Sequence, residues 1–155
     1  IYHRIWRRTA RVSAVLAEAN PEKESALAQF GFNLGMAFQI ADDLFDYTLE
    51  TPQLGKQVGA DLREGKLTLP VIQALRQVPP AEREWLVSVI RNPQFSSEDF
   101  GRLVELLGSC GAIRYAEQAA EKFIAAAKNE LAAFPPSAAL ETLADIADYA
   151  LHRRV

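Results

Sequence analysis

The helical spacing of the apolar residues limits the possible folds of this chain more than any other feature. Apolar residues recur every three or four positions along most of the sequence, and no strand-like alternation of useful length is found. Breaks containing proline, at residues 20–21, 79–80 and 134–136, divide this pattern into segments of helical length. We therefore expect an all-α fold, an antiparallel helical bundle that forms a single domain over residues 1–155.

Prolines and capping residues set the expected helix boundaries. Thr68 can cap a helix with Pro70 in its first turn, and Ser96 with Asp99 three residues later resembles a capping box. The glycine-rich and charged residues 51–66 predict an ordered loop. The expected helices cover residues 2–19, 22–47, 69–77, 81–91, 98–107, 111–133 and 137–152. In the first helix, the residues expected to face inward are Ile5, Val12, Val15 and Leu16.

The composition excludes several classes of protein. The chain is 49% hydrophobic and 24% charged, which is typical of a soluble globular protein rather than a disordered one. A net charge of −3 gives no electrostatic reason to expect nucleic-acid binding. The single Cys110 excludes an internal disulfide and fits a reducing cytoplasm. Because no stretch is long and apolar enough to span a bilayer, we expect a cytoplasmic protein with at most peripheral membrane contact.

Residues 38–47, FQIADDLFDY, place three carboxylates and an amide in an otherwise apolar helical run. Positions three and four apart share one face of a helix, so the polar residues form one stripe: Gln39, Asp42, Asp43 and Asp46. Carboxylates this close repel one another unless cations lie between them. Mg²⁺ suits such a stripe, because it binds one or two carboxylates and keeps waters and phosphate oxygens. Taken alone, the motif also fits a solvated acidic face.

The segment that follows combines lysines with glycines. In GKQVGADLREGKLTLP, residues 55–70, the charged side chains Lys56, Asp61 and Lys66 stand among three glycines. Such a loop can close over a metal site, with lysines as point charges for phosphate and the aspartate as a further acid for a metal ion. An exposed turn with ordinary surface lysines is the alternative for the loop taken alone. The acidic stripe, the basic loop and the basic first helix together favour a phosphate site.

Glycines in the second expected helix have a packing interpretation. Gly31 and Gly35 have the GxxxG spacing, which in a helix of this kind more often allows close helix packing than catalysis. We therefore expect another helix to approach the second helix closely at these positions.

The run FGFNLGMAFQIADDLFDY at 30–47, followed by residues 55–70, closely resembles the second aspartate-rich region of trans-isoprenyl diphosphate synthases. Within that family it is most similar to the long-chain, octaprenyl-type branch. The similarity extends to RRTA at 7–10 and to residues 111–131. It covers nearly the whole chain, but only the C-terminal half of the family's usual length. The resemblance implies the C-terminal half of the isoprenoid synthase fold and a homodimer.

The resemblance also implies roles for the acidic residues. Asp42 and Asp46 match ligands of the Mg²⁺ ions that hold the diphosphate of an allylic substrate. Asp43 is expected to act through a metal-bound water or from just outside the metal's ligands, and Asp61 is expected to reach the metal through water.

Basic and polar residues are matched in the same way. Lys56 and Lys66 correspond to lysines that clamp the diphosphate. Arg8 stands where the family usually has lysine, so a planar fork replaces a compact ammonium. Thr9 and Gln39 correspond to polar groups that face the reacting carbons and can stabilise a carbocation. Of these residues, Thr9, Gln39 and Lys56 are the implied catalytic groups, and all five are implied to bind substrate.

The implied reaction joins isopentenyl diphosphate to an allylic diphosphate. Cleavage of the allylic C–O bond leaves a cation and pyrophosphate, and metal ions with basic side chains stabilise that leaving group. The family's first aspartate-rich motif is absent, so residues 1–155 alone are not expected to catalyse elongation. Two alternatives remain open: a non-catalytic partner subunit of a synthase, and a helical interaction module.

Overall fold

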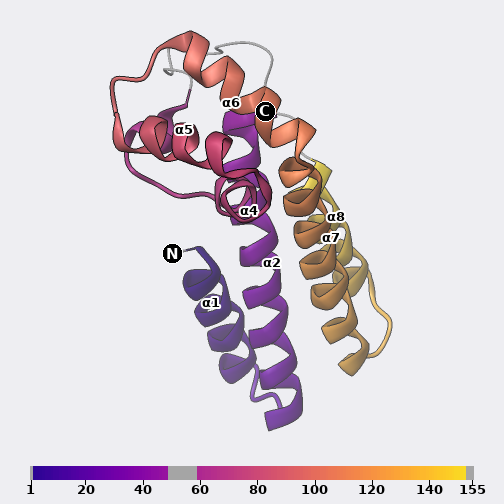
Figure 1. Ribbon diagram of the computed structural model, residues 1–155. Helices are drawn as coiled ribbons and strands as arrows, with labels where there is room; N and C mark the ends of the chain where they lie inside the picture. Colours follow the sequence, from indigo (N-terminus) through magenta and orange to yellow (C-terminus); the bar gives the residue numbers. More distant parts are fainter. Residues whose placement is uncertain (1, 49–58, 153–155) are drawn as a thin grey trace. The chain divides into compact units, whose positions relative to one another are not determined.

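The structure, a computed structural model, describes residues 2–48 and 59–152, and every regular element in these ranges is a helix (Figure 1). The elements are α1 (Tyr2–Leu16), α2 (Pro21–Thr48), α3 (Ala60–Arg63), α4 (Leu69–Gln77), α5 (Pro80–Arg91), α6 (Ser97–Ser109), α7 (Ala112–Glu130), the 3₁₀ turn η2 (Leu131–Ala133) and α8 (Ala138–His152). The all-α prediction is confirmed. The short helix α3 is a difference, because it lies within the segment expected to be a loop. Within the described residues, no helix is long and apolar enough to cross a membrane.

The chain divides into two compact units. The second unit is Asp42–Glu117, and the first comprises the residues before and after it. Helices α2 and α7 therefore contribute residues to both units. The expectation that residues 1–155 form a single domain stays a prediction.

In the first unit, α1 packs closely against α2. A Cβ atom at Gly31 would lie 2.5 Å from the carbonyl oxygen of Trp6, and one at Gly35 would lie 2.6 Å from Cα of His3. The two backbones are therefore nearly in contact at both glycines. This confirms that the GxxxG spacing serves helix packing.

The expectation that four aliphatic residues of α1 face inward was wrong. Ile5, Val12, Val15 and Leu16 are all exposed, with Leu16 at 80%. The buried residue of α1 is Ala14, at 1%. At the contact, Ala10 lies beside Gly31, and the rings of Tyr2, His3 and Trp6 pack on phenylalanines of α2, while the aliphatic side chains point elsewhere.

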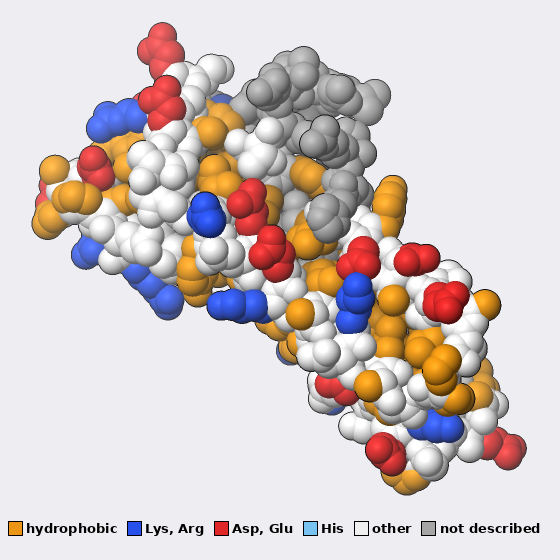
Figure 2. All heavy atoms as spheres, turned by 90° about the vertical axis from the view of Figure 1, so that its right-hand side faces the viewer, with side chains coloured by type: hydrophobic (Ala, Val, Ile, Leu, Met, Phe, Trp, Pro, Cys, Tyr) orange, Lys and Arg blue, Asp and Glu red, His pale blue; other side chains and the backbone are white. Residues whose placement is uncertain are grey.

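A cluster of alanines, larger aliphatic residues and one phenylalanine forms the core of the first unit. Its buried members come from α2, α7, η2 and α8: Phe30, Leu34, Ala37, Ile124, Ala127, Leu131, Ala147 and Ala150. On α8, Ile146 and Tyr149 remain exposed. Figure 2 likewise shows hydrophobic side chains exposed among charged ones on one face of the molecule.

We predict that Gly31→Ala destabilises the protein although alanine favours helix. The added Cβ would meet backbone atoms of Trp6, which cannot move aside as a flexible side chain can. We expect a loss of about 1–3 kcal/mol in the free energy of unfolding, measured by urea denaturation. Gly101→Ala on α6 is the matched control, because its Cβ meets no atom within 4 Å. The control should gain about 0.5–1 kcal/mol. Equal effects of the two substitutions would contradict the close α1–α2 contact.

In the second unit, α4 packs against α5 and α6. The capping box predicted at the start of α6 is confirmed. Ser96 Oγ accepts a hydrogen bond of 3.0 Å from the backbone N–H of Asp99, and Asp99 Oδ2 accepts one of 3.1 Å from the N–H of Ser96. The buried core residues are Tyr47, Leu62, Val71, Ala74, Val78, Leu86, Val89, Phe95, Phe100, Leu103, Leu107 and Ala112.

Candidate functional site

The acidic end of α2 forms the first side of the site. Leu44 and Tyr47 are buried and anchor the last turns of this helix. Asp42 is exposed, whereas Asp43 and Asp46 are partly buried. Because Asp42 and Asp46 are one helical turn apart, they share one face of α2.

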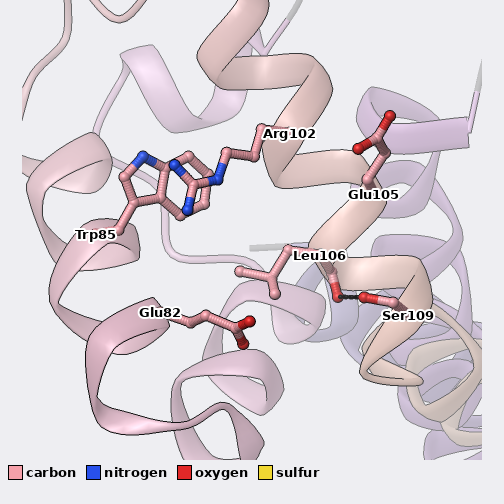
Figure 3. Close-up of a pocket in the computed structure, with 6 residues that line it drawn as sticks. All are labelled: Glu82, Trp85, Arg102, Glu105, Leu106 and Ser109. Carbon is pink, nitrogen blue, oxygen red and sulfur yellow. Dashed lines mark hydrogen bonds between the residues drawn. The ribbon is translucent and has the colours of Figure 1, made fainter.

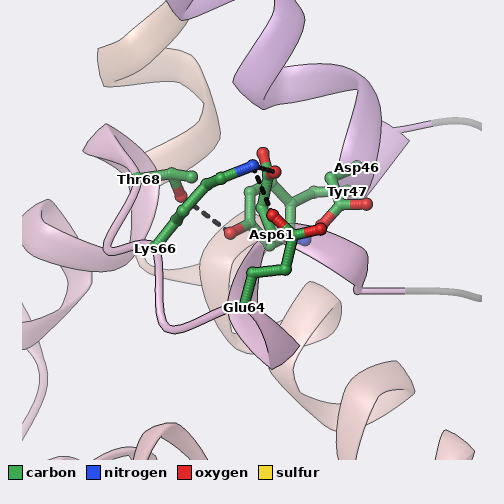
Figure 4. A network of polar contacts seen from close by, with 6 residues as sticks. All are labelled: Asp46, Tyr47, Asp61, Glu64, Lys66 and Thr68. Carbon is green, nitrogen blue, oxygen red and sulfur yellow. Dashed lines mark hydrogen bonds and ion pairs between the residues drawn. The ribbon is translucent and has the colours of Figure 1, made fainter.

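The short helix α3 brings a further acid to this face. Gly59, with φ of 75°, turns the chain into α3, and Gly65, with φ of 76°, follows it. Such φ values favour glycine over any residue with a Cβ atom. The backbone N–H of Asp61 donates a hydrogen bond of 3.2 Å to Oδ2 of Asp46. The turn therefore places Asp61 beside the α2 carboxylate (Figure 4).

Lys66 completes the cluster. Its Nζ donates a hydrogen bond of 2.7 Å to Oδ1 of Asp61 and lies 2.8 Å from Oε2 of Glu64. The hydrogen bonds to Asp61 and Glu64 raise the pKa of Lys66, so the group stays an ammonium. Its side chain is 57% exposed, and an ion pair so exposed is weak. A phosphate group can therefore displace the carboxylates that hold it.

Electrostatics at Asp46 favour a bound cation. Burial raises the pKa of Asp46, and the negative charge of Asp61 raises it further, against the hydrogen bond from the Asp61 N–H. The N–H of Ala60 and the charge of Lys66 also lower the pKa of Asp46, but the net direction is upward, so the ionised carboxylate is only partly compensated by its surroundings. A cation beside the two carboxylates would supply that compensation.

The carboxylate oxygens fit a hard divalent cation whose remaining ligands come from a phosphate group. Within residues 2–48 and 59–152, no group of three His, Cys, Asp or Glu side chains is placed to hold a metal ion. Mg²⁺ commonly needs only one or two carboxylates when waters and substrate phosphates complete its shell. The acids at Asp42, Asp46 and Asp61 would suit Mg²⁺ bound together with a diphosphate, but they would not form an all-protein cage.

The remaining predicted residues lie outside this cluster. Arg8 and Thr9 are exposed on α1, and Gln39 is partly buried on α2, all three in the first unit. Lys56 lies outside the described residues. The structure therefore brings together Asp46, Asp61 and Lys66 of the second unit, and the roles of all the predicted site residues stay predictions.

Thr9 borders an apolar hollow of about 320 Å³ on the first unit. The hollow lies among α1, α2 and α8. A mostly apolar concavity with a single hydroxyl can hold a hydrocarbon group. Its lining consists of Ile5, Trp6, Thr9, Ala10, Phe30, Gly31, Leu34, Leu143 and Ile146.

A second hollow, of about 290 Å³, lies in the second unit and contains no predicted site residue (Figure 3). It is bordered by side chains of α5 and α6. The guanidinium of Arg102 lies 4.0 Å from the centroid of the Trp85 ring, a cation–π contact between the two helices. Packing of α5 against α6 explains the contact between Arg102 and Trp85, so we assign no functional role to this hollow.

The sequence interpretation missed three residues of the cluster. Glu64 is a second partner of Lys66, and Tyr47 is hydrogen-bonded to Thr68 at 2.7 Å. Thr68 does precede α4 as predicted, but its side chain makes no capping bond. The signal available for Tyr47 was its position directly after Asp46, the last acid of the stripe.

Comparison with known proteins assigns the family. The model of the family described as polyprenyl synthetase matches residues 5–107. The chain belongs to the polyprenyl synthetase family. Octaprenyl diphosphate synthase of Escherichia coli K12 is 35% identical over 152 residues, which are 97% of this chain and 46% of the relative. A short chain isoprenyl diphosphate synthase of Methanothermobacter thermautotrophicus is also 35% identical, over 92% of this chain and 43% of the relative.

Solved structures of polyprenyl synthetases agree with this assignment. Polyprenyl synthase from Caulobacter crescentus CB15, crystallised with calcium and isoprenyl diphosphate, has a TM-score of 0.87 and 38% identity. The match covers 97% of this chain and 46% of that one. The resemblance and the isoprenoid synthase fold expected from the sequence are both confirmed. The chain spans about half the length of these relatives.

Proposed function

We propose that this chain is the part of a Mg²⁺-dependent trans-polyprenyl diphosphate synthase that binds the allylic diphosphate. The whole enzyme would condense isopentenyl diphosphate with an allylic diphosphate in isoprenoid biosynthesis. The observation that carries the proposal is the cluster of Asp46, Asp61 and Lys66, with two acids and an exposed ammonium in contact. These residues stand in the segments most similar to the family's second aspartate-rich region.

The acids would hold the metal. Asp42 and Asp46 would bind Mg²⁺ directly, while Asp43 and Asp61 would hold its waters. When bound, the metal neutralises the diphosphate and stabilises pyrophosphate as a leaving group. Asp61 already donates its N–H to Asp46, so this carboxylate is oriented before any ligand arrives.

The basic residues would hold the diphosphate. Lys66 would move from Asp61 to a phosphate oxygen, where its charge offsets the charge that develops on C–O cleavage. Lys56 and Arg8 would take further phosphate oxygens. By the resemblance, Thr9 and Gln39 would face the reacting carbons.

Further properties of the whole enzyme form part of this proposal. A homodimer, a cytoplasmic location and at most peripheral membrane contact follow from the resemblance and the sequence. A non-catalytic partner subunit, which would retain the family's fold and stabilise or regulate a complete synthase chain, is the second candidate. The acid and lysine cluster favours the first candidate, since a purely structural subunit has no use for it.

Calorimetric titration with inorganic pyrophosphate tests the proposal. Binding should be measurable with Mg²⁺ and lost when EDTA removes the metal, because the acids repel an uncompensated anion. A helical interaction module would bind no pyrophosphate under either condition. Absence of Mg²⁺-dependent binding would therefore overturn the proposed function.

A further inference from the structure

An aromatic column lies in the core of the second unit. It consists of the rings of Tyr47, Phe100 and Phe95, all at most 5% exposed. The centroids of Tyr47 and Phe100 are 6.1 Å apart with an interplanar angle of 15°, and those of Phe100 and Phe95 are 6.1 Å apart at 16°. The column therefore connects the end of α2 to α6 and to Phe95, two residues before α6 begins.

The segment from Gly59 to Thr68, which carries Asp61 and Lys66, contacts this column at three points. A Cβ atom at Gly59 would lie 2.7 Å from the Phe100 ring. The Arg63 guanidinium lies 3.9 Å from the Phe95 centroid and donates a hydrogen bond of 2.9 Å to the Phe95 carbonyl. At the other end of the column, the Tyr47 hydroxyl and Thr68 Oγ1 are 2.7 Å apart.

The Tyr47–Thr68 hydrogen bond takes the place of a helix-capping bond at the start of α4. Thr68 occupies the N-cap position of α4, where a threonine hydroxyl would ordinarily accept a bond from the helix. It bonds to Tyr47 instead, 21 residues earlier in the chain. Both side chains are buried, and burial raises the pKa of Tyr47, so the phenol stays neutral. Helix capping therefore does not account for this threonine.

The two hydroxyls stand next to the groups of the site. Tyr47 directly follows Asp46, and Thr68 lies two residues after Lys66. We propose that Tyr47 and Thr68 are positioning residues, whose hydrogen bond holds Asp61 and Lys66 beside Asp46 before a ligand arrives (Figure 4). The inference rests on the proposed function for its ligand, and on the hydrogen bonds for its geometry.

Tyr47→Phe tests the inference, because it keeps the stacked ring and removes only the hydroxyl. Without this hydrogen bond, the segment from Gly59 to Thr68 is less ordered in the free protein. Ordering it on binding costs free energy and weakens the affinity for the ligand. A loss of about 1 kcal/mol corresponds to about fivefold weaker Mg²⁺-dependent binding of pyrophosphate. Thr68→Val should weaken binding equally, and the double variant no further, since both lose the same bond. Thr68→Ser keeps the hydroxyl and should bind as the wild type does.

Ile124→Val is the matched control, because it loses one methylene in the core of the first unit. It should lower the urea midpoint of unfolding and leave pyrophosphate affinity unchanged. A Tyr47→Phe variant that loses stability but binds as tightly as the wild type would overturn the inference.

Hydrogen exchange gives a readout that needs no ligand. The amide of Asp61 donates to Asp46, so its exchange reports whether the segment stays in place. The rate should rise about fivefold in Tyr47→Phe and stay unchanged in Ile124→Val. An unchanged rate in Tyr47→Phe would contradict the positioning role. If the wild type binds no pyrophosphate, the proposed function fails while this exchange experiment still decides the inference.

Discussion

Asp42→Ala and Asp46→Asn should each weaken Mg²⁺-dependent binding of pyrophosphate by about 100-fold or more. Each change removes one of the two carboxylates expected to bind the metal directly. Asp46→Asn is preferred to alanine because an amide oxygen can still accept the N–H of Asp61. The affinities are measured by calorimetry at saturating Mg²⁺.

Asp145→Asn on α8 is the control for the loss of one negative charge, since Asp145 is an exposed acid of the first unit. Its affinity should match the wild type. A site that needed only overall charge would instead gain affinity for the anion in all three variants. That result would contradict the proposal that Asp42 and Asp46 bind the metal.

No chain elongation is expected from residues 1–155 alone. The family's first aspartate-rich motif and its neighbouring basic residues are absent from this sequence, so nothing here is assigned to bind and orient isopentenyl diphosphate. Without that orientation, the rate should lie on the order of 10³-fold or more below that of a complete synthase. Incorporation of radiolabelled isopentenyl diphosphate into farnesyl diphosphate measures this rate, with Escherichia coli octaprenyl diphosphate synthase as the reference.

Normal turnover by this chain alone would contradict the assignment of the two substrates to different halves. Turnover that appears only when a complete but weakly active synthase chain is added would favour the partner-subunit alternative. The pyrophosphate titration separates these cases from an interaction module.

The helix starts marked by proline and by the capping box were predictable because local chemistry determines them, whereas α1 ends at Leu16, before the expected residue 19. Proline at residues 21 and 80 and the Ser96–Asp99 capping box act within a few positions, so the sequence displays them directly. The acidic stripe was predictable for the same reason, since helical spacing alone places Asp42 and Asp46 on one face.

Features that depend on distant partners were harder to predict. The inward face of α1 is decided by how closely α2 approaches at Gly31 and Gly35, and apolar spacing within α1 does not reveal this distance. A four-residue helix such as α3 is too short to display a helical period. The hydrogen bond of the Thr68 hydroxyl to Tyr47, in place of a capping bond, can be predicted only when Tyr47 is known to lie beside Thr68.

A crystal structure of this chain with Mg²⁺ and methylenebisphosphonate tests the central claim most directly. We expect Mg²⁺ at about 2.0–2.1 Å from carboxylate oxygens of Asp42 and Asp46, with the bisphosphonate completing its shell. Lys66 Nζ should have left Asp61 for a phosphonate oxygen. A metal and bisphosphonate bound elsewhere, with Lys66 still paired to Asp61 and Glu64, would contradict the account.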